Sequence, residues 1–482
     1  MTDQVIRTRM APSPTGEMHI GGLRTLLFSY AFAKKHDGQF VLRIEDTDKK
    51  REVPGAVDRI LQVIRKYGLS WDEGPQTGGP YGPYIQSQRL EIYNKYIKEL
   101  LDKKLAYYCF CTPERLSDMR QKQQAAGQIP KYDRHCLDLS DSEIQKNLSA
   151  RKPCVIRLRV PDNETVSFND AVRGEIKIST REIDDQVLIK SDGIPTYHFA
   201  VVVDDHLMKI SHVIRGDEWI SSAPKQILLY KYFGWEIPVF AHLPVFLDPG
   251  GQGKMSKRHG TVSAQSFLDE GYLPQAMLNF LMLLGWNPGT DQEIFSLTEF
   301  IKEFSLERLH KKQPVFDRKK LDYLNAHYIR EMSDKELVNL LTPFVPDLDK
   351  ATLLQLVPLL RERITRLTDA FGLTRFLVDS LNYEKILLLQ RGTDETAAVS
   401  MLLKVKNLLN QTQDWSPGNL QPLLMKLIGD NNWNTGQFFM VFRVAVCGSP
   451  ITLPVVECLP ILGRDKTIAH IDLAIKKLQD KL

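Results

Sequence analysis

The sequence has few cysteines, no long apolar run and almost no excess of charge. Six of its 482 residues are cysteine, too few and too unevenly spaced for a disulfide framework, which leaves reduced thiols or one metal site. No stretch reaches the roughly 18 apolar residues of a membrane span, and the first residues lack the apolar segment of an export signal. We therefore expect a cytoplasmic protein with no membrane contact, and we expect it to act as a monomer.

The charge and the length of the chain further limit the class of protein. The net charge of +4 is the small difference between 63 basic and 59 acidic residues, so any contact with a polyanion must come from local clusters. The pattern GxGxxG does not follow the first strand, which disfavours dinucleotide binding. The chain exceeds one ordinary core, and its 43% hydrophobic content suits a soluble protein of several domains.

The first segments alternate between strand and helix patterns. Residues 5–11 read as a strand, and a periodic apolar stretch follows, with Leu23, Leu26 and Leu27 on one face. Gly38 is a plausible helix stop, and residues 39–45 read as a buried strand. This order is typical of a parallel α/β sheet and predicts a Rossmann-like nucleotide fold.

Changes of pattern divide the chain into five regions. Sheet patterning is lost after a helical stretch, returns with the segment that begins PTYHFAVVVDDHLMKI, and gives way to helical periods beyond about residue 266. The prediction is an α/β chain with a Rossmann-like parallel-sheet catalytic domain, an inserted α+β domain and an all-α C-terminal half. The expected regions are the first catalytic half, the insertion, the second catalytic half, a connector and a helical end, at 1–106, 107–194, 195–265, 266–330 and 331–482.

Two loops are suited to phosphate. In PSPTGEMHIGG, which ends at Gly22, Thr15 and His19 offer donors while Gly21 and Gly22 allow close approach to the backbone. Taken alone, the segment is equally a proline-rich turn that caps a helix.

The second loop, GGQGKMSKRHG, places Lys254, Lys257 and Arg258 after three glycines, which make the segment a poor helix. The two loops could close over one triphosphate from two sides and stabilise the charge of a nucleotidyl transfer without a covalent nucleophile.

These motifs resemble a known family. PSPTGEMHIGG and KMSKR look like the two nucleotide-binding motifs of class I aminoacyl-tRNA synthetases, and RIEDTD with residues 195–219 and 316–329 resembles the bacterial glutamyl-tRNA synthetases. Gly22 and Arg258 depart from the general motifs in the way that this branch usually does. The resemblance implies ATP-dependent attachment of L-glutamate to tRNA(Glu) through glutamyl-adenylate, with Mg²⁺ accompanying ATP. It also implies that the insertion binds the acceptor stem, the connector contacts the tRNA stem and the helical end binds the anticodon.

The resemblance also implies roles for single residues. Arginine pairs well with carboxylates, so Arg9 and Arg215 would hold the two carboxylates of glutamate, Glu45 its ammonium group, and Ser13 and Tyr197 would complete the pocket. The residues expected to bind ATP are Thr15, His19, Gly21, Trp219, Lys254 and Lys257, of which His19 and the two lysines would be catalytic. Lys254 and Lys257 are assigned to the pyrophosphate.

Ordinary readings of the same residues stay open. An arginine at a strand end is more often part of a surface ion pair. Asp204 with Asp205, and Asp217 with Glu218, could suggest a two-metal site, but neighbouring residues on a strand point to opposite faces, so a structural role is favoured.

The cysteines of the insertion form a candidate metal site. Cys109 and Cys111 lie one residue apart, and Cys136 follows after a loop of the length that zinc modules use. Asp138 is the expected fourth ligand and Tyr132 the alternative, whereas His135 is less convenient because it adjoins Cys136. One structural Zn²⁺ is the prediction, and three reduced thiols are the alternative. The resemblance agrees, since some members of the family hold zinc in this way.

The helical half carries candidate RNA contacts. Residues 308–330 interleave cations with Phe and Tyr, which suits phosphate contact and stacking, although a solvated helix face is equally consistent. Arg361, Arg363 and Arg366 are candidate anticodon readers, none favoured individually.

Two other functions remain as alternatives. A glutamyl-queuosine tRNA(Asp) synthetase would share both motifs but lack the helical half. A catalytically silent RNA-binding paralogue would be expected to lose His19, Lys254 or Lys257, and all three are present. Whether the tRNA for glutamine is also charged stays open.

Overall fold

The structure is a computed structural model that describes residues 5–251, 253 and 262–480. The chain divides into two compact units, one made of Met1–Leu268 with Pro274–Arg318 and the other of Asp269–Leu273 with Lys319–Leu482. Each unit is described by itself. The five expected regions are finer than this division, and their boundaries stay predictions.

The first unit is built on parallel strands. β1 (Arg7–Met10) pairs in parallel with β2 (Gln39–Leu42), and α1 (Ile20–Lys35) connects them. β8 (His212–Gly216) and β9 (Val239–Leu243) form a second parallel pair joined by α7 (Ala223–Phe233). The amide of Ser211 donates to the Arg7 carbonyl at 2.9 Å, which places the start of β8 beside β1. The expected Rossmann-like parallel sheet, split by an insertion, is confirmed.

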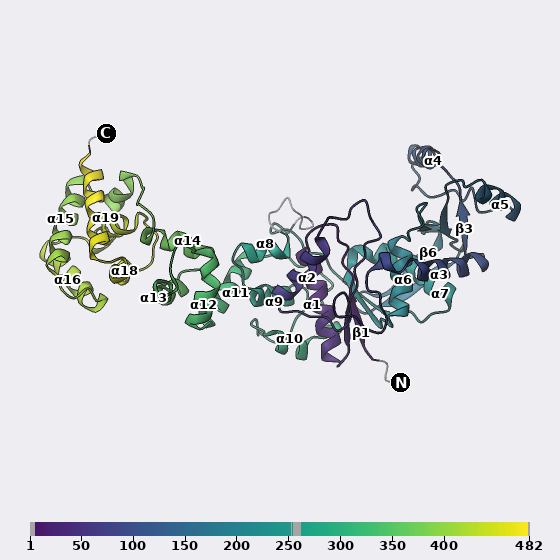
Figure 1. The fold of residues 1–482 in the computed structure, drawn as a ribbon, viewed down its shortest axis with the longest axis horizontal. Helices are drawn as coiled ribbons and strands as arrows, with labels where there is room; N and C mark the ends of the chain where they lie inside the picture. The colour runs from purple at the N-terminus through teal and green to yellow at the C-terminus, as the bar shows by residue number, and fades with distance from the viewer. Residues whose placement is uncertain (1–4, 252, 254–261, 481–482) are drawn as a thin grey trace. The chain divides into compact units, whose positions relative to one another are not determined.

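Local chemistry sets the limits of α1, which lies alongside β1 (Figure 1). Its buried face includes Leu23, Leu26 and Leu27, the three leucines expected to share one side. Lys34 and Lys35 stand in its last turn, where cations favour the helix dipole. At Gly38 an added Cβ would lie 2.1 Å from the Ile6 carbonyl oxygen, so only glycine lets the chain turn back into β2.

The inserted segment is partly β, as expected. β3 (Ala106–Cys109), β4 (Val155–Leu158) and β7 (Val187–Ile189) form an antiparallel sheet. The hairpin of β5 (Thr165–Asp170) and β6 (Gly174–Ser179) instead joins the sheet of β8 and β9, because Asp170 pairs with Phe240. The end of β5 therefore lies against the catalytic sheet.

One sheet prediction is wrong. The segment PTYHFAVVVDDHL was expected to resume the parallel sheet, but it forms the helix α6 (Tyr197–Leu207). Val201, Val202 and Val203 are all buried, and a short apolar run buried on every side has no periodicity that separates a strand from a helix. Asp204 and Asp205 consequently lie on a helix, and the argument that they point to opposite faces of a strand does not apply.

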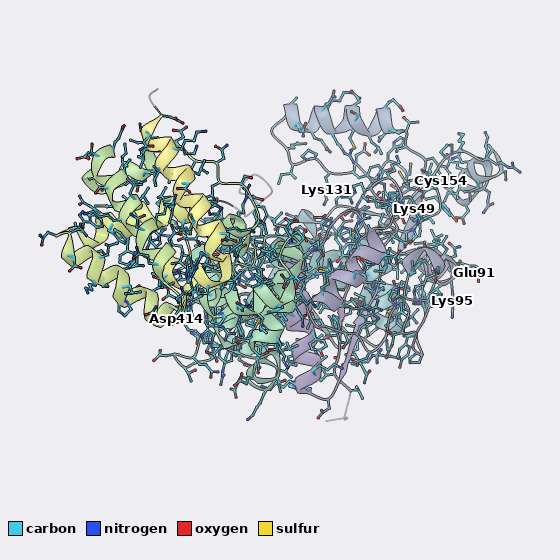
Figure 2. The ribbon with its side chains drawn as sticks, turned by 60° about the vertical axis from the view of Figure 1, so that its left-hand side comes forward. Lys49, Glu91, Lys95, Lys131, Cys154 and Asp414 are labelled. Atoms are coloured by element: carbon cyan, nitrogen blue, oxygen red, sulfur yellow. The ribbon has the colours of Figure 1, made fainter. Side chains whose placement is uncertain are left out.

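The remaining helices of the first unit surround these sheets. On α3, the exposed side chains of Glu91 and Lys95 point away from the protein body (Figure 2). The bounds are α2 (Ala56–Lys66), α3 (Leu90–Asp102), α4 (Pro113–Ala125), α5 (Asp141–Ser149), α8 (Ala264–Asp269), α9 (Pro274–Leu283) and α10 (Leu297–Glu303).

The second unit is helical throughout its described length, which confirms the all-α C-terminal half (Figure 1). Ser333 caps α12 through a reciprocal capping box with Glu336, so the polar start of the helix is satisfied locally. The main helices are α11 (Arg318–Glu331), α12 (Asp334–Leu341), α13 (Lys350–Arg361), α14 (Asp369–Thr374), α15 (Glu395–Gln411), α16 (Pro417–Asp430), α17 (Thr435–Cys447), α18 (Val455–Leu462) and α19 (Arg464–Gln479). In the ranges that the structure describes, none of the helices combines the length and the apolarity needed to cross a bilayer.

Candidate active site

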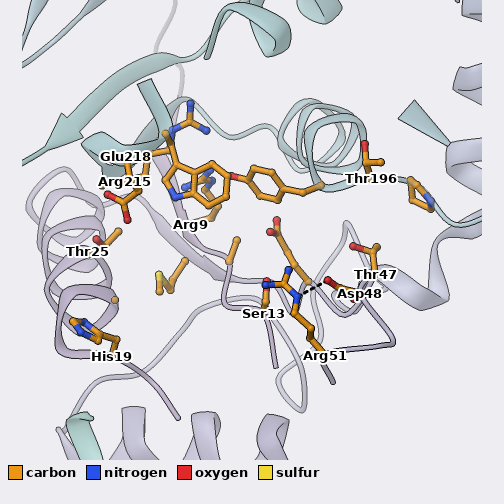
Figure 3. Close-up of a pocket in the computed structure, with 18 of the residues that line it drawn as sticks. Arg9, Ser13, His19, Thr25, Thr47, Asp48, Arg51, Thr196, Arg215 and Glu218 are labelled. Atoms are coloured by element: carbon orange, nitrogen blue, oxygen red, sulfur yellow. Dashed lines mark hydrogen bonds and ion pairs between the residues drawn. The ribbon is translucent and has the colours of Figure 1, made fainter. Parts of the chain in front are cut away.

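The first unit contains a cavity of about 930 Å³ where β1 and β8 end and where α1 and α6 begin. This is the edge of a Rossmann-like sheet at which ligands bind. Figure 3 shows His19 and Thr25 toward one end of the pocket and Thr47, Asp48 and Thr196 toward the other, with Arg9 and Ser13 between them. The expected site residues that line the cavity are Arg9, Ser13, His19, Gly21, Glu45, Tyr197, Arg215 and Trp219.

The start of α1 forms one end of the pocket. His19 is the N-cap residue, and its Nδ1 accepts the amide of Gly21 at 3.0 Å. A Cβ on Gly21 would lie 3.3 Å from that ring nitrogen, so the glycine allows the close cap. Because the first amides and the dipole of a helix favour negative charge, this end of the cavity is suited to an anion.

Buried charges form another part of the pocket wall and its backing. Arg9 on β1 donates from Nε to Oδ1 of Asp205 at 3.3 Å, and Arg43 donates from Nη1 to the same oxygen at 2.8 Å. Arg43 also donates from Nη2 to Oε1 of Glu45 at 3.1 Å. Burial raises the pKa of Glu45 to about 7, although Arg43 and Arg9 lower it. Burial also acts upward on the pKa of Asp205, but the two arginines bring it below its ordinary value.

Asp204 anchors the wall behind these residues. Arg89 donates from Nε to its Oδ1 at 2.7 Å, while Gln86 and the Tyr93 hydroxyl donate to its Oδ2 at 2.9 and 2.8 Å. The Nε of Arg43 lies 3.6 Å from the same Oδ2. The carboxylates of α6 therefore hold Arg9, Arg43 and Arg89, which agrees with the structural role expected for them.

Arg215, at the end of β8, is buried against β9. Its Nε donates to Nε2 of His242 at 3.0 Å, and its Nη1 donates to the Gln226 side-chain oxygen at 2.8 Å. Burial lowers the pKa of this arginine, and the nearby Tyr197 counteracts the effect. Arg215 therefore reaches the cavity with its side chain held in place by His242 and Gln226.

Aromatic rings border the same space. The rings of Tyr197 and Trp219 meet with centroids 4.5 Å apart, and burial raises the pKa of the tyrosine. His198 beside them is largely neutral, because burial lowers its pKa to about 4. Ser13 completes the lining from the first loop.

Some expected residues lie elsewhere. Thr15 is exposed and does not line the cavity. Asp217 pairs with Arg173 at 2.7 Å and accepts the amide of Val245, so it has a structural role, whereas Glu218 lies in the pocket wall. Of the second loop, the structure describes Gly250, Gly251 and Gly253. The lysines and the arginine of KMSKR, Lys254, Lys257 and Arg258, lie outside the described residues.

Sequence reasoning missed several residues that lie behind the cavity wall and hold its side chains. Arg43 could have been found, since it stands two residues before Glu45 in an extended segment, where alternate residues share a face. Gln86, Gln226 and His242 could not, because each meets its partner only after folding, at separations of 118, 11 and 27 residues.

The insertion holds a thiol cluster. The sulfurs of Cys109, Cys111 and Cys136 all lie within 4.8 Å of one another. The Tyr132 hydroxyl lies 3.2 Å from the Cys109 sulfur and 3.3 Å from that of Cys111, and it accepts the amide of Cys136 at 3.1 Å. Asp138 is exposed and does not belong to the group of candidate ligand atoms. Three thiols with a phenol beside them match the soft donors that zinc prefers.

The charges around the cluster favour a thiolate. The hydrogen bond from Cys136 lowers the pKa of Cys109 to about 4, and it raises the pKa of Cys136 itself. The guanidinium of Arg157 lies 4.0 Å over the Tyr132 ring and also hydrogen-bonds the Cys109 sulfur, which lowers its pKa. Cys154, labelled in Figure 2, is a separate free cysteine.

The candidate RNA contacts of the helical unit differ in their surroundings. Arg361 pairs with Asp334 and donates to the Arg330 carbonyl at 3.2 Å. Arg363 is exposed, and Arg366 lies 5.8 Å over the Tyr272 ring. On α11, Tyr323 is 52% exposed and Lys320 lies 4.8 Å over its ring, so a flat aromatic surface beside a cation is available there.

A parallel sheet that ends beside the start of a helix and beside buried arginines has the form of a class I synthetase catalytic domain. The family described as "tRNA synthetases class I (E and Q), catalytic domain" matches residues 5–323, and an "Anticodon binding domain" matches residues 336–475. The chain therefore belongs to the E and Q family of class I aminoacyl-tRNA synthetases.

Within this family, the chain is similar to proteins described as glutamate–tRNA ligases. The chain is 44% identical to a glutamate–tRNA ligase of Borrelia recurrentis over 97% of this chain and 95% of the relative. It is 42% identical to the glutamate–tRNA ligase of Clostridium tetani over the full length of both. The crystal structure of a glutamate–tRNA ligase from Elizabethkingia meningosepticum in complex with its amino acid is 35% identical and matches with a TM-score of 0.87, covering 98% of this chain and 100% of that one.

Proposed function

We propose that this protein attaches L-glutamate to tRNA(Glu) in two steps, through a glutamyl-adenylate. One observation carries the proposal. A single cavity brings together two buried arginines, Arg9 and Arg215, a carboxylate, Glu45, and the start of α1 at His19. The first three match the charges of glutamate, and the helix start matches a phosphate chain.

On the glutamate side, the arginines bind the two carboxylates. Each guanidinium is held from behind, Arg9 by Asp205 and Arg215 by His242, so its orientation is set before the substrate enters. Glu45 takes the ammonium group, which offsets the cost of keeping this carboxylate charged in a buried place. Ser13 and Tyr197 add hydroxyl groups to the same space.

On the ATP side, His19 and the dipole at the start of α1 attract the phosphate groups, Gly21 lets them come close to the backbone, and Trp219 lies near the adenosine. Thr15 is a weaker candidate for ATP binding, because it does not line the cavity. ATP enters with Mg²⁺ as substrate. A carboxylate oxygen of glutamate attacks the α-phosphorus, the bond to the leaving pyrophosphate breaks, and Lys254 and Lys257 stabilise the charge that moves onto it.

In the second step, a ribose hydroxyl of the terminal adenosine attacks the acyl carbon and AMP leaves. The helical unit would bind the anticodon loop, a role supported by the match of residues 336–475 to an anticodon-binding domain. A queuosine-type synthetase would lack that unit. We further propose that the protein works in the cytoplasm as a monomer.

ATP–pyrophosphate exchange tests the proposal. Exchange should depend on glutamate and should not occur with glutamine or aspartate, measured with and without tRNA. Charging assays on the purified tRNAs for glutamate and for glutamine then define the acceptor. Absence of glutamate-dependent exchange under both conditions contradicts the proposal.

We also propose that the thiol cluster binds one structural Zn²⁺ through Cys109, Cys111, Cys136 and the Tyr132 hydroxyl. The contacts of Tyr132 with two of the sulfurs support it as fourth ligand in place of Asp138. The ion would supply cross-links to a small apolar cluster in the insertion and would take no part in the reaction.

Metal analysis of the purified protein tests the zinc proposal. We expect one zinc per chain in the wild type and in the Cys154→Ser control, and none in Cys136→Ser. Tyr132→Phe should weaken retention against a chelator, whereas Asp138→Asn should not. Zinc absent from the wild type, or lost in Asp138→Asn but kept in Tyr132→Phe, overturns the assignment.

A further inference from the structure

A chain of hydrogen bonds runs from the inserted hairpin to the pocket arginine. Nδ1 of His242 lies 2.6 Å from Oδ2 of Asp170, and Nε2 of the same ring accepts from Arg215 Nε at 3.0 Å. Asp170 and His242 are 1% and 0% exposed, so water does not compete with either contact. Neither residue lines the cavity.

Proton placement in this chain is fixed by the donors available. A guanidinium donates only, so Nε2 of His242 must offer a lone pair and the ring proton must sit on Nδ1. That proton is donated to Asp170, which also accepts the amides of Val172 and Arg173 at 3.0 and 2.9 Å and that of His242 at 3.2 Å. Burial lowers the pKa of His242, which agrees with a neutral ring.

The same chain determines how Arg215 stands. Nε is held by His242 and Nη1 by Gln226, which fixes two edges of the planar group. Nη2 is buried and has no hydrogen-bond partner among the residues that the structure describes. The Phe240 ring lies 5.1 Å from the guanidinium carbon and stacks on the His242 ring at an interplanar angle of 4°, so both groups share one support.

We propose that Asp170 and His242 are positioning residues that orient Arg215 toward a carboxylate of glutamate. The inference rests on the proposed function, because it needs Arg215 to contact the substrate. Asp170 sets the tautomer of His242, His242 accepts from Nε, and the remaining donors of the guanidinium stay aimed at the cavity. Neither residue touches the substrate.

Asp170 belongs to the inserted segment of the chain. It is the last residue of β5, the hairpin strand that leaves the insertion and joins the catalytic sheet. Three residues further, Arg173 pairs with Asp217, next to the pocket residue Glu218. The hairpin is therefore part of the support of the glutamate pocket as well as of the insertion.

Two substitutions of His242 separate its two contacts. In His242→Gln the amide reaches the position of Nε2 and presents an oxygen to Arg215. In His242→Asn the amide reaches the position of Nδ1, keeps the bond to Asp170 and leaves Nε of Arg215 without an acceptor. We expect His242→Asn to raise KM for glutamate by roughly tenfold to hundredfold, with KM for ATP unchanged, because a hydrogen bond to a charged group is lost. His242→Gln should restore most of the affinity.

Asp170→Asn provides the same test with the ring retained, and it replaces His242→Asn where that variant does not fold. Its amide can donate to Nδ1, which would leave a proton on Nε2 facing the Nε proton of Arg215. KM for glutamate should rise as in His242→Asn. His206→Asn is the matched control, since His206 stacks on Trp235 and does not line the cavity. Thermal unfolding of each variant is measured alongside.

Arg215→Lys separates this inference from the proposed function. If Arg215→Lys leaves KM for glutamate unchanged, the role of Arg215 is wrong and both proposals fall. If it raises KM but His242→Asn and Asp170→Asn do not, only the positioning inference is overturned. Equal KM values in His242→Asn and His242→Gln also overturn it, because they would show that the acceptor at Nε2 has no effect on Arg215.

Discussion

The two ends of the pocket are built in opposite ways. At the glutamate end, Arg9, Glu45 and Arg215 are buried and each contacts another charged or polar side chain behind it. At the end proposed for the nucleotide, His19 is exposed and caps α1, and Gly21 and Gly22 line the cavity beside it. One end presents fixed charge, and the other presents the positive end of a helix dipole.

The difference follows from what each ligand requires. Glutamate is small, so its recognition depends on charges held at set positions before it binds. A triphosphate is highly charged, and its charge is redistributed during the reaction. Contacts that strengthen only in the transition state therefore accelerate the reaction more than contacts that bind ATP equally well throughout. Substitutions at the two ends should accordingly separate into effects on KM for glutamate and effects on the rate of adenylate formation.

The largest effect is expected in the second loop. Lys257→Ala should slow adenylate formation by about 100-fold to 1,000-fold and weaken ATP binding far less, because the lysine acts on charge that develops during transfer. Single-turnover kinetics and equilibrium ATP binding measure the two quantities. Lys146→Ala, on α5 of the insertion, is the control. An unchanged adenylation rate would remove this loop from catalysis.

At the glutamate end, Glu45→Gln should raise KM for glutamate by roughly tenfold to hundredfold with KM for ATP unaltered, because the ammonium group loses its charged partner. Glu52→Gln is a matched control in the same part of the chain, where Glu52 pairs with Lys49 at 3.0 Å. An equal rise in KM for glutamate and in KM for ATP would contradict the separation of the two ends.

His19→Asn tests the nucleotide end without removing the helix cap. Asparagine is a good N-cap residue and can still accept the Gly21 amide, so thermal stability should stay near that of the wild type. The rate of adenylate formation should fall by about tenfold, since a donor to phosphate is lost. A fall in stability with no change in rate would instead assign His19 to capping alone.

The smallest effect is a pH dependence. Because the pKa of Glu45 is about 7, its carboxylate is charged above that pH and protonated below it. A protonated Glu45 cannot pair with an ammonium group, so KM for glutamate should rise by about tenfold between roughly pH 8 and pH 6. In Glu45→Gln the profile over this range should be flat. A wild-type KM that is constant over the range would exclude Glu45 as the ammonium partner.

Parts of the fold could be predicted because their signals are local. α1 follows from its apolar period and from the polar turn before it, and β1 and β2 follow from their flanking turns. α6 was misassigned because Val201, Val202 and Val203 are buried on all sides and favour strands by propensity. Its helical state depends on packing that no window of the sequence contains.

The candidate site divides in the same way. Residues inside a motif, such as His19 and Glu45, could be assigned from the resemblance. His242 and Asp170 lie 72 residues apart and stand in no motif, so the sequence offered no reason to join them. Tyr132 was open against Asp138, and only the contacts of its hydroxyl with the cluster distinguish it. Reasoning from a single sequence cannot predict which distant residues tertiary folding brings into contact.

The buried network around Asp204 and Asp205, taken by itself, is balanced in charge. Its charged members are three cations and three anions, namely Arg9, Arg43, Arg89, Glu45, Asp204 and Asp205. Arg215 adds one positive charge, and its hydrogen-bond acceptors, Gln226 and a neutral His242, do not cancel it. Glutamate, if it binds there as proposed, brings one net negative charge that matches the charge of Arg215. Glutamine carries none, and it would leave an uncompensated cation in a place from which water is largely excluded.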